Sequence, residues 1–373
     1  MNNPQRTALL AAALASLAGT AGAQQVTLYG SIDTGVERVS HARGDGSALV
    51  RVPSITGTQA SRVGVRGEED LGNGAKALFV IENGFNADTG AAGQGGRMWG
   101  RQAFVGLSSA SLGTLTLGRQ YTMLNYPLIT GDILGPNLYG LGSLDSYLPA
   151  ARSDNTLAYR HKLGGLGFGA TYSTGRDTVG NGATSCAGEG NAGPVACRQV
   201  SAMVQYDTAD WGLGYAIDEQ RGGGTLGASF YNGAAAIAMP NSSDKDRRQA
   251  VTGWAKLAGV KVAGGWIGRR VDTATTDVKS DMLFLGASVP VTAAWTFDGE
   301  AIRIVNSDQQ RSASMLVGRG VYSFSKRTAV YAQLGWLDNG KGAQYTVSSG
   351  GGGTTPTAGT NQLGSFVGMR HTF

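Results

Sequence analysis

Apolar and polar positions alternate along much of the chain, and the alternation is clearest in the last segment, residues 361–373. Leu363, Val367, Met369 and Phe373 share one parity, and small or polar residues such as Arg370 share the other. Successive side chains of a strand point to opposite faces, so this segment predicts a strand with one apolar face. A soluble domain seldom ends on an exposed phenylalanine. We therefore interpret the apolar face as lipid-facing, with Phe373 in an interfacial aromatic girdle.

Similar alternating segments recur roughly every 22 residues, including 26–36, 61–68 and 155–162. Short connections such as 71–74 take turns with long ones, of which 122–153 is the longest. Short turns on one rim and long loops on the other are expected of an outer-membrane barrel. Counting the segments gives 16 candidate strands. An even number permits closure by pairing of the last strand with the first, which leaves no unpaired edge in lipid.

Two structural alternatives stay open at this point. The stretch 222–240 is either a loop or an additional hairpin. A β-sandwich also alternates apolar and polar residues. The unequal connections, and the many charged residues opposite the apolar face, favour a barrel with a watery lumen.

Composition supports the all-β interpretation. The chain has 60 Gly among 373 residues, and glycine inside helices costs about 1 kcal/mol relative to alanine. Residues 1–23 have the features of a signal peptide, with Arg6, an apolar stretch and the small-residue site Ala21-Gly22-Ala23. The remainder, 24–373, is interpreted as one domain. The net charge of +5 is too mild to indicate a nucleic-acid partner.

The residues that could carry chemistry are few. Cys186 and Cys197 are expected to form a local disulfide in an oxidising compartment, with two free thiols as the alternative. Zinc sites need three or four ligands, so a metal site is not expected. The three histidines, His41, His161 and His371, have no recognisable nucleophile signature around them. We therefore predict no enzymatic activity and no cofactor.

The segment 61–74, SRVGVRGEEDLGNG, resembles the second strand and first tight turn of Gram-negative general porins, most closely those of betaproteobacteria. The segments 26–30, 115–119 and 325–331 and the terminal Phe373 agree in order, so the resemblance spans nearly the whole mature chain. It implies a 16-stranded, trimeric barrel in the outer membrane, in contact with the lipid bilayer and lipopolysaccharide. It also implies passive diffusion of ions and small hydrophilic solutes, and a third long loop that folds inward to narrow the pore.

The inward-folded loop corresponds to residues 122–153. By resemblance and parity, basic side chains on the barrel wall face acids of this loop across the constriction. The candidate residues are Arg38, Arg62, Glu82, Arg101 and Arg152 on the wall, and Asp132 and Asp145 on the loop.

Parity separates the wall candidates. Arg62 lies opposite Val63 and Val65 and is the best lumen candidate, and Arg152 shares parity with inward-facing positions of its strand. Arg38 and Glu82 are assigned to the inward face. By contrast, Arg101 and Arg119 share parity with apolar neighbours and point toward lipid unless a bulge intervenes. Several wall arginines against two loop acids predict a weak preference for anions.

Three other functions stay open at this stage. A substrate-specific channel would show an aromatic track and saturable conductance. A surface adhesin or structural barrel would conduct negligibly when reconstituted. A secreted soluble sandwich would need no detergent.

Overall fold

The computed structural model describes residues 25–54, 57–176, 186, 188–189, 193, 195–224, 226–228 and 236–373. The expected signal peptide, residues 1–23, lies outside the described residues. No helix in the described ranges is long and apolar enough to cross a membrane.

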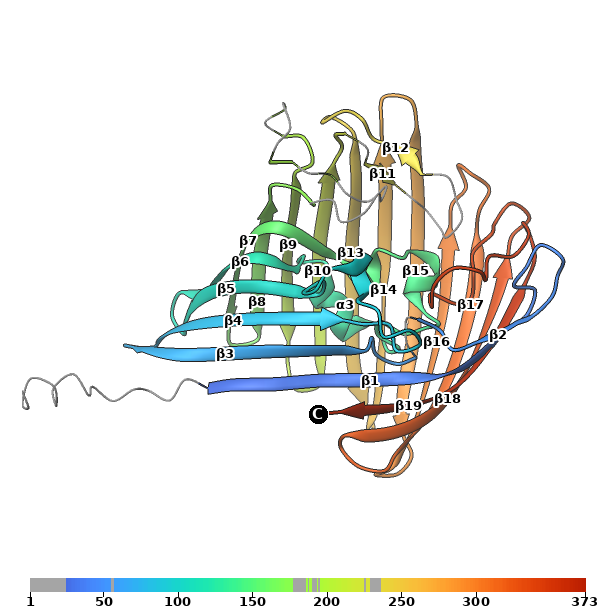
Figure 1. Ribbon diagram of the computed structural model, residues 1–373, viewed down its shortest axis with the longest axis horizontal. Coiled ribbons are helices and arrows are strands. Elements are labelled where there is room, and N and C mark those ends of the chain that lie inside the picture. The colour runs from blue at the N-terminus through green and yellow to red at the C-terminus, as the bar shows by residue number, and fades with distance from the viewer. Residues whose placement is uncertain are drawn as a thin grey trace, which may run out of the picture.

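A single antiparallel sheet of 17 strands forms the wall of the molecule (Figure 1). One of its members, β2 (Leu49–Arg51), is a three-residue strand beside β1, and the other sixteen make the barrel. The sixteen strands are β1 (Gln25–Val39), β3 (Arg62–Gly72), β4 (Ala75–Gly84), β5 (Gln102–Ser109), β6 (Gly113–Tyr121), β7 (Arg152–Leu163), β8 (Leu166–Ser173), β9 (Gln199–Asp207), β10 (Trp211–Arg221), β13 (Lys245–Leu257), β14 (Val260–Asp272), β15 (Asp277–Pro290), β16 (Trp295–Val305), β17 (Ala313–Ser323), β18 (Thr328–Asn339) and β19 (Gln362–Thr372).

The sheet closes on itself where the two ends of the chain meet. Strand β1 pairs with β3 along its first half and with β19 along its second, and the register places Val36 opposite Val367. The backbone N–H of Gly30 also donates to the carbonyl of Phe373 at 3.0 Å. The predicted closure of a 16-stranded barrel by the last segment is therefore confirmed.

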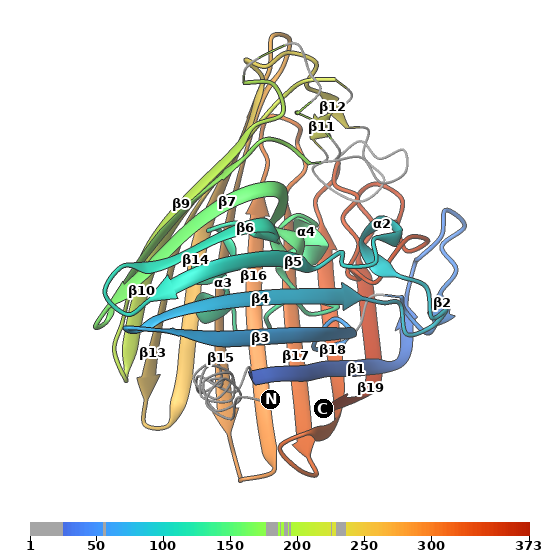
Figure 2. The same cartoon turned by 60° about the vertical axis from the view of Figure 1, so that its left-hand side comes forward.

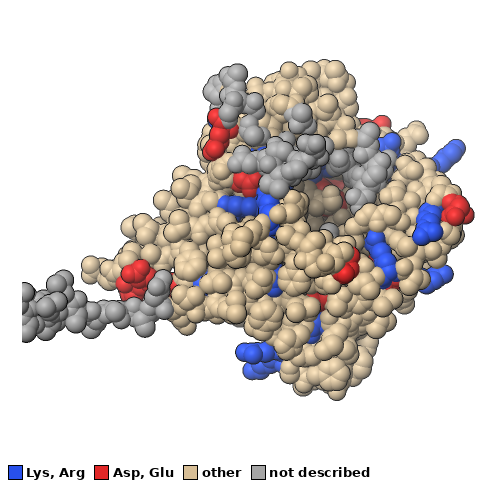
Figure 3. Space-filling model, viewed as in Figure 1, with Lys and Arg blue, Asp and Glu red and all other residues tan. Residues whose placement is uncertain are grey.

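The alternation of apolar and polar residues matches the two faces of this wall. Val367 on β19 is 66% exposed on the outside, whereas its neighbour Phe366 is 1% exposed on the inside. Leu28 and Val36 on β1 are likewise exposed, and Asp33 between them is buried. Figure 3 shows mostly neutral side chains over the strands of the viewed face. The outward apolar belt suits a lipid environment, in which a closed barrel satisfies every backbone hydrogen bond within its wall.

Connections of two sizes alternate around the barrel. Strands β3 and β4 are joined by the two-residue turn Asn73-Gly74, and β13 and β14 by Ala258-Gly259. The longest connection, between β6 and β7, contains α3 (Asn125–Gly131), α4 (Leu141–Leu144) and the short 3-10 helix η1 (Leu148–Ala150). The other short elements are α2 (Gly93–Gly96) and a small hairpin of β11 (Gly227–Ala228) and β12 (Ile237–Ala238), within the stretch that the sequence left open.

Candidate functional site in the barrel lumen

The connection between β6 and β7 lies inside the barrel, where both views place α3 and Figure 2 also shows α4 (Figures 1 and 2). We call residues 122–151 the inner loop. Its first part is held by two strands: the backbone N–H of Met123 donates to Ser201 Oγ at 2.8 Å, and Thr252 Oγ1 donates to the carbonyl of Pro127 at 3.0 Å. Apolar side chains of the loop, including Leu124 and Leu144, are fully buried. The core of the molecule therefore lies between this loop and the inner wall.

The middle of the inner loop packs against β18, β19 and the loop that joins them. The Tyr139 ring covers Gly335 and Gly364, and a Cβ atom at Gly364 would lie 2.7 Å from Tyr139 Cζ. Ser143 Oγ donates to the carbonyl of Val347 at 2.7 Å, so the β18–β19 loop also enters the barrel. The buried ring needs a wall position without a side chain, and glycine provides it.

A buried ionic cluster ties the far end of the inner loop to β13 and β14. Asp145 Oδ2 lies 2.8 Å from Arg248 Nε and 3.8 Å from Arg269 Nη1. Asp246 contacts the same two arginines, at 3.1 and 2.7 Å. The Arg248 guanidinium also lies 4.4 Å from the centroid of the Tyr147 ring. Burial alone would raise the pKa of Asp145, but the two arginines hold that pKa below its usual range. We call these four charged residues the loop anchor.

Beside the inner loop, the lumen contains a cavity of about 530 Å³, which we call the lumen cavity. Its charged lining comprises five basic and two acidic side chains. They are Arg62, Arg101, Lys261, Arg319, Arg370, Glu82 and Asp132.

Wall acids neutralise part of this positive charge. Arg101 Nε lies 2.6 Å from Glu82 Oε1, and Arg62 Nε lies 3.7 Å from Glu82 Oε2. On the other side of the cavity, Arg319 Nη2 lies 2.7 Å from Asp298 Oδ2. Opposite charges this close attract each other and hold the side chains in place.

The remaining basic groups contact neutral acceptors of the loops. Lys261 Nζ donates to the carbonyl of Thr130 at 2.9 Å, and Arg370 Nη1 donates to Thr58 Oγ1 at 2.8 Å. Neither acceptor carries a charge, so neither forms an ion pair with these cations.

Asp132 is the acid that the inner loop contributes to the lumen cavity. Its Oδ1 accepts hydrogen bonds from the backbone N–H groups of Leu134 and Gly135, at 2.9 and 2.8 Å. Burial raises the pKa of Asp132 to about 6, because the ionised carboxylate loses solvation there, and the hydrogen bonds with Gly135, Glu300 and Leu134 offset this shift only in part.

The predicted wall residues divide into three groups. Arg62 and Glu82 line the lumen cavity as parity indicated. Arg101 also lines it, because it precedes β5 in a bend where strand alternation does not apply. Arg152 points inward but is buried behind the inner loop, where its Nη2 donates to Tyr121 Oη at 2.6 Å. It borders a separate cavity of about 240 Å³.

Two residues that the sequence assigned to the constriction, Arg38 and Asp145, do not line the lumen cavity. Arg38 lies on the exposed outer face, because it is two positions from outward-facing Val36 and the buried position between them is Glu37. Asp145 belongs to the loop anchor, so its charge is neutralised by wall arginines instead of facing the lumen cavity. Arg119, whose orientation parity left open, lies at a β-bulge in β6 and forms an ion pair with Asp154.

Three cations of the lumen cavity were missed by the sequence analysis. Lys261, Arg319 and Arg370 all occupy inward positions of their strands, two residues from buried Ala263, Val317 and Gly368. The same alternation that selected Arg62 would have identified them.

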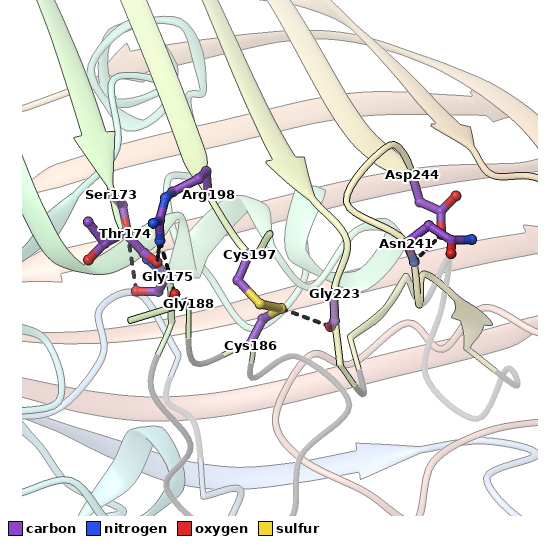
Figure 4. The surroundings of a disulfide bond; sticks show 10 residues. All are labelled: Ser173, Thr174, Gly175, Cys186, Gly188, Cys197, Arg198, Gly223, Asn241 and Asp244. Atoms are coloured by element: carbon purple, nitrogen blue, oxygen red, sulfur yellow. Dashed lines mark hydrogen bonds between the residues drawn. A yellow bond between two sulfur atoms is a disulfide. The ribbon is translucent and has the colours of Figure 1, made fainter. Parts of the chain in front are cut away.

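The two cysteines form a disulfide near the start of β9 (Figure 4). The Cα atoms of Cys186 and Cys197 are 5.2 Å apart, and the backbone N–H of Cys197 donates to the carbonyl of Gly222 at 3.0 Å. The bridge therefore lies next to the connection that follows β10. Within the described part of the chain, no group of three or more His, Cys, Asp or Glu side chains is arranged to hold a metal ion.

Comparison with known proteins gives consistent matches. The family model for Gram-negative porins matches residues 8–342. Outer membrane porin protein 32 of Delftia acidovorans is 31% identical, over 99% of this chain and 100% of that protein. The fold is similar to the anion-selective porin from Comamonas acidovorans, with a TM-score of 0.76, 22% identity and coverage of 94% of this chain and 100% of the other. It is also similar to the trimer form of OmpT from Vibrio cholerae, with a TM-score of 0.65, 14% identity and the same coverage.

Proposed function

Because this chain belongs to the family of Gram-negative porins and is a protein of the cell outer membrane, we propose that its lumen is a water-filled channel for passive diffusion. The solutes are ions and small hydrophilic molecules, with a weak preference for anions. The inner loop narrows the channel, and the lumen cavity is the point at which permeating ions meet the charged wall. This proposal assigns no catalytic step to any residue.

The charge of the lumen cavity is the observation that carries the anion preference. Five basic side chains and two acids line it, and Asp298 neutralises Arg319, which leaves two positive charges in excess when Asp132 is ionised. Rings of basic side chains in a pore favour anions, because they lower the electrostatic energy of an anion relative to a cation. The anion selectivity stated for the Comamonas acidovorans porin supports the same direction.

Arg62→Glu tests this proposal, because it replaces a positive lumen charge by a negative one. The net charge of the lining then falls by two. The permeability ratio of chloride to potassium, obtained from the zero-current potential across a planar bilayer, should fall. The matched control is Arg38→Glu, which makes the same chemical change on the outer face of the barrel. An unchanged ratio in Arg62→Glu, or an equal change in both variants, would contradict the role given to the lumen cavity.

We further propose that the protein is a homotrimer whose outer surface contacts the bilayer and lipopolysaccharide. The trimer form of Vibrio cholerae OmpT, which shares the fold, supports this assembly state. An SDS gel of the unheated protein should show a band at about three times the mass of the heated chain. A single band at the monomer position before and after heating would contradict the trimer.

A further inference from the structure

Three basic side chains form a row on the outside of the barrel, away from the lumen cavity. Arg247 on β13 lies directly opposite Arg270 on β14, and Arg270 lies directly opposite Lys279 on β15. Their neighbours Arg269 and Val278 are buried on the inner face, so the row faces outward. We call these three residues the outer basic row.

Like charges in this arrangement repel one another. Side chains directly opposite on antiparallel strands have Cβ atoms about 5 Å apart, and like charges at that spacing destabilise the sheet. Glu219 reduces the repulsion at Arg247 by forming an ion pair with it, in which Arg247 Nε lies 2.9 Å from Glu219 Oε2. Among the described residues, no carboxylate lies within 4.0 Å of the side-chain nitrogens of Arg270 or Lys279. These two cations therefore form no ion pair within the described part of the chain.

Acids do occur near the row, but they are engaged differently. Asp281 accepts a hydrogen bond from the indole N–H of Trp266 at 2.8 Å, and Asp308 accepts one from the backbone N–H of Lys279 at 2.9 Å. Asp272 and Asp277 lie opposite each other, two residues from Arg270 and Lys279 and nearer the end of the hairpin. None of these four acids forms an ion pair with the row in the described part of the chain.

The row marks the upper border of the apolar belt. Arg270 lies two residues before the end of β14. Trp266 lies four positions before Arg270 on β14, closer to the middle of the barrel wall. Its cross-strand neighbours Val251 and Leu283 are exposed apolar residues. Tryptophan is enriched at the level of lipid headgroups. An amphiphile with an anionic headgroup at the row would place its acyl chain on the belt.

A hollow of about 200 Å³ lies at the row. Gly268 contributes no side chain there, and the Trp266 ring lies so close that a Cβ atom at Gly268 would overlap it. The hollow is lined by Arg247, Gln249, Trp266, Gly268, Arg269, Arg270, Lys279, Ser280 and one acid, Asp281. The outer basic row therefore offers two arginine guanidinium groups and one ammonium group to a single ligand, and the Asp281 carboxylate beside them already accepts the indole N–H of Trp266.

We propose that the outer basic row binds a phosphate group of lipopolysaccharide in the outer leaflet. The planar fork of arginine matches phosphate oxygens in a bidentate manner, and the lysine adds a point charge. The orientation rests on the proposed outer-membrane channel. Long loops lie on the extracellular side of such barrels, and β13 follows a long loop. The phosphate would supply the ion-pair partner that neither Arg270 nor Lys279 has among the described residues.

The test compares Arg270→Glu/Lys279→Glu with the control Lys326→Glu/Arg327→Glu. The control changes the same two residue types, which are exposed in the short turn between β17 and β18. Rough-type lipopolysaccharide is titrated into each detergent-purified protein, and bound lipid is counted by native mass spectrometry. We expect at least tenfold weaker binding in the first variant and unchanged binding in the control. Lipid A without its phosphates should bind the wild type as weakly as the first variant binds the phosphorylated lipid.

Several results would overturn the site. If both variants bound lipopolysaccharide equally well, the row would not be the binding site. If millimolar inorganic phosphate displaced the lipopolysaccharide, the row would be a site for the free ion. Loss of the trimer in the first variant would identify the row as a subunit contact. The milder Arg270→Gln/Lys279→Gln guards against misfolding: lipopolysaccharide should raise the melting temperature of the wild type more than that of this variant.

Conductance separates this proposal from the channel function. The outer-row variants should keep wild-type single-channel conductance whether or not they bind lipid, because the row does not line the lumen cavity. A barrel that binds lipopolysaccharide at the row but conducts no ions would refute the channel and leave the lipid site standing.

Discussion

Replacing Asp145 by asparagine should release the inner loop from the wall. The substitution keeps the shape of the side chain and removes one of the two negative charges in the loop anchor. In the native cluster, Asp145 and Asp246 balance Arg248 and Arg269 through contacts of 2.7 to 3.8 Å. After the change, two buried guanidinium groups share Asp246 alone, so one positive charge loses its partner.

The expected decrease in the free energy of unfolding follows from the loss of this partner. Removing one partner of a buried ion pair costs about 3–5 kcal/mol, because the other charge stays buried without compensation. Asp246 still contacts both arginines, so we expect the lower end of the range, about 3 kcal/mol. Equilibrium unfolding in guanidinium chloride, followed by tryptophan fluorescence in detergent, measures this free energy. Single-channel recording should show larger and noisier conductance, because a detached loop no longer holds a fixed position in the lumen.

Asp45→Asn is the matched control, since Asp45 is an exposed loop acid whose Oδ1 accepts one hydrogen bond, from the backbone N–H of Ser47. It should change the free energy of unfolding by less than about 0.5 kcal/mol, as is usual for surface substitutions. If Asp145→Asn behaved like this control in both assays, the ionic cluster would not be what holds the inner loop, and the anchor would have to lie in the apolar contacts.

Two further predictions concern the inner loop. Gly364→Ala should destabilise the barrel by about 1–3 kcal/mol in the same unfolding assay, because its Cβ atom would overlap the buried Tyr139 ring; Gly318→Ala, which meets nothing within 4 Å, should not. Lowering the pH from 8 to 5 should increase anion preference, because the raised pKa of Asp132, about 6, lies within that range and protonation removes a negative charge. Asp132→Asn should reduce this pH dependence of the zero-current potential, and an unchanged pH profile would show that another group titrates.

The wall could be predicted from the sequence because alternation is a local property. Whether a strand residue faces lipid or lumen depends on its parity, as Val367 and Phe366 show. The method fails where the backbone departs from a regular strand: Arg101 precedes β5 in a bend, and Arg119 lies at a bulge. Arg38 was wrong for a simpler reason, since its parity with Val36 already places it outside.

The loop anchor could not be predicted in the same way. Asp145 and Arg248 are 103 positions apart, and their contact depends on the path of the inner loop across the lumen. That path is set by packing, such as the fit of Tyr139 against two wall glycines. The sequence identified the loop and its acids, but only the structure separates Asp132, which lines the cavity, from Asp145, which holds the loop.

The zero-current potential of the purified wild-type protein in a gradient of potassium chloride tests the central claim most directly. The protein is inserted into a planar bilayer, and the sign of the potential reports which ion crosses more easily. The excess of basic side chains in the lumen cavity predicts the sign that corresponds to faster chloride permeation, reduced at high salt by screening. A potential of the opposite sign, or no conductance at all, would contradict the account.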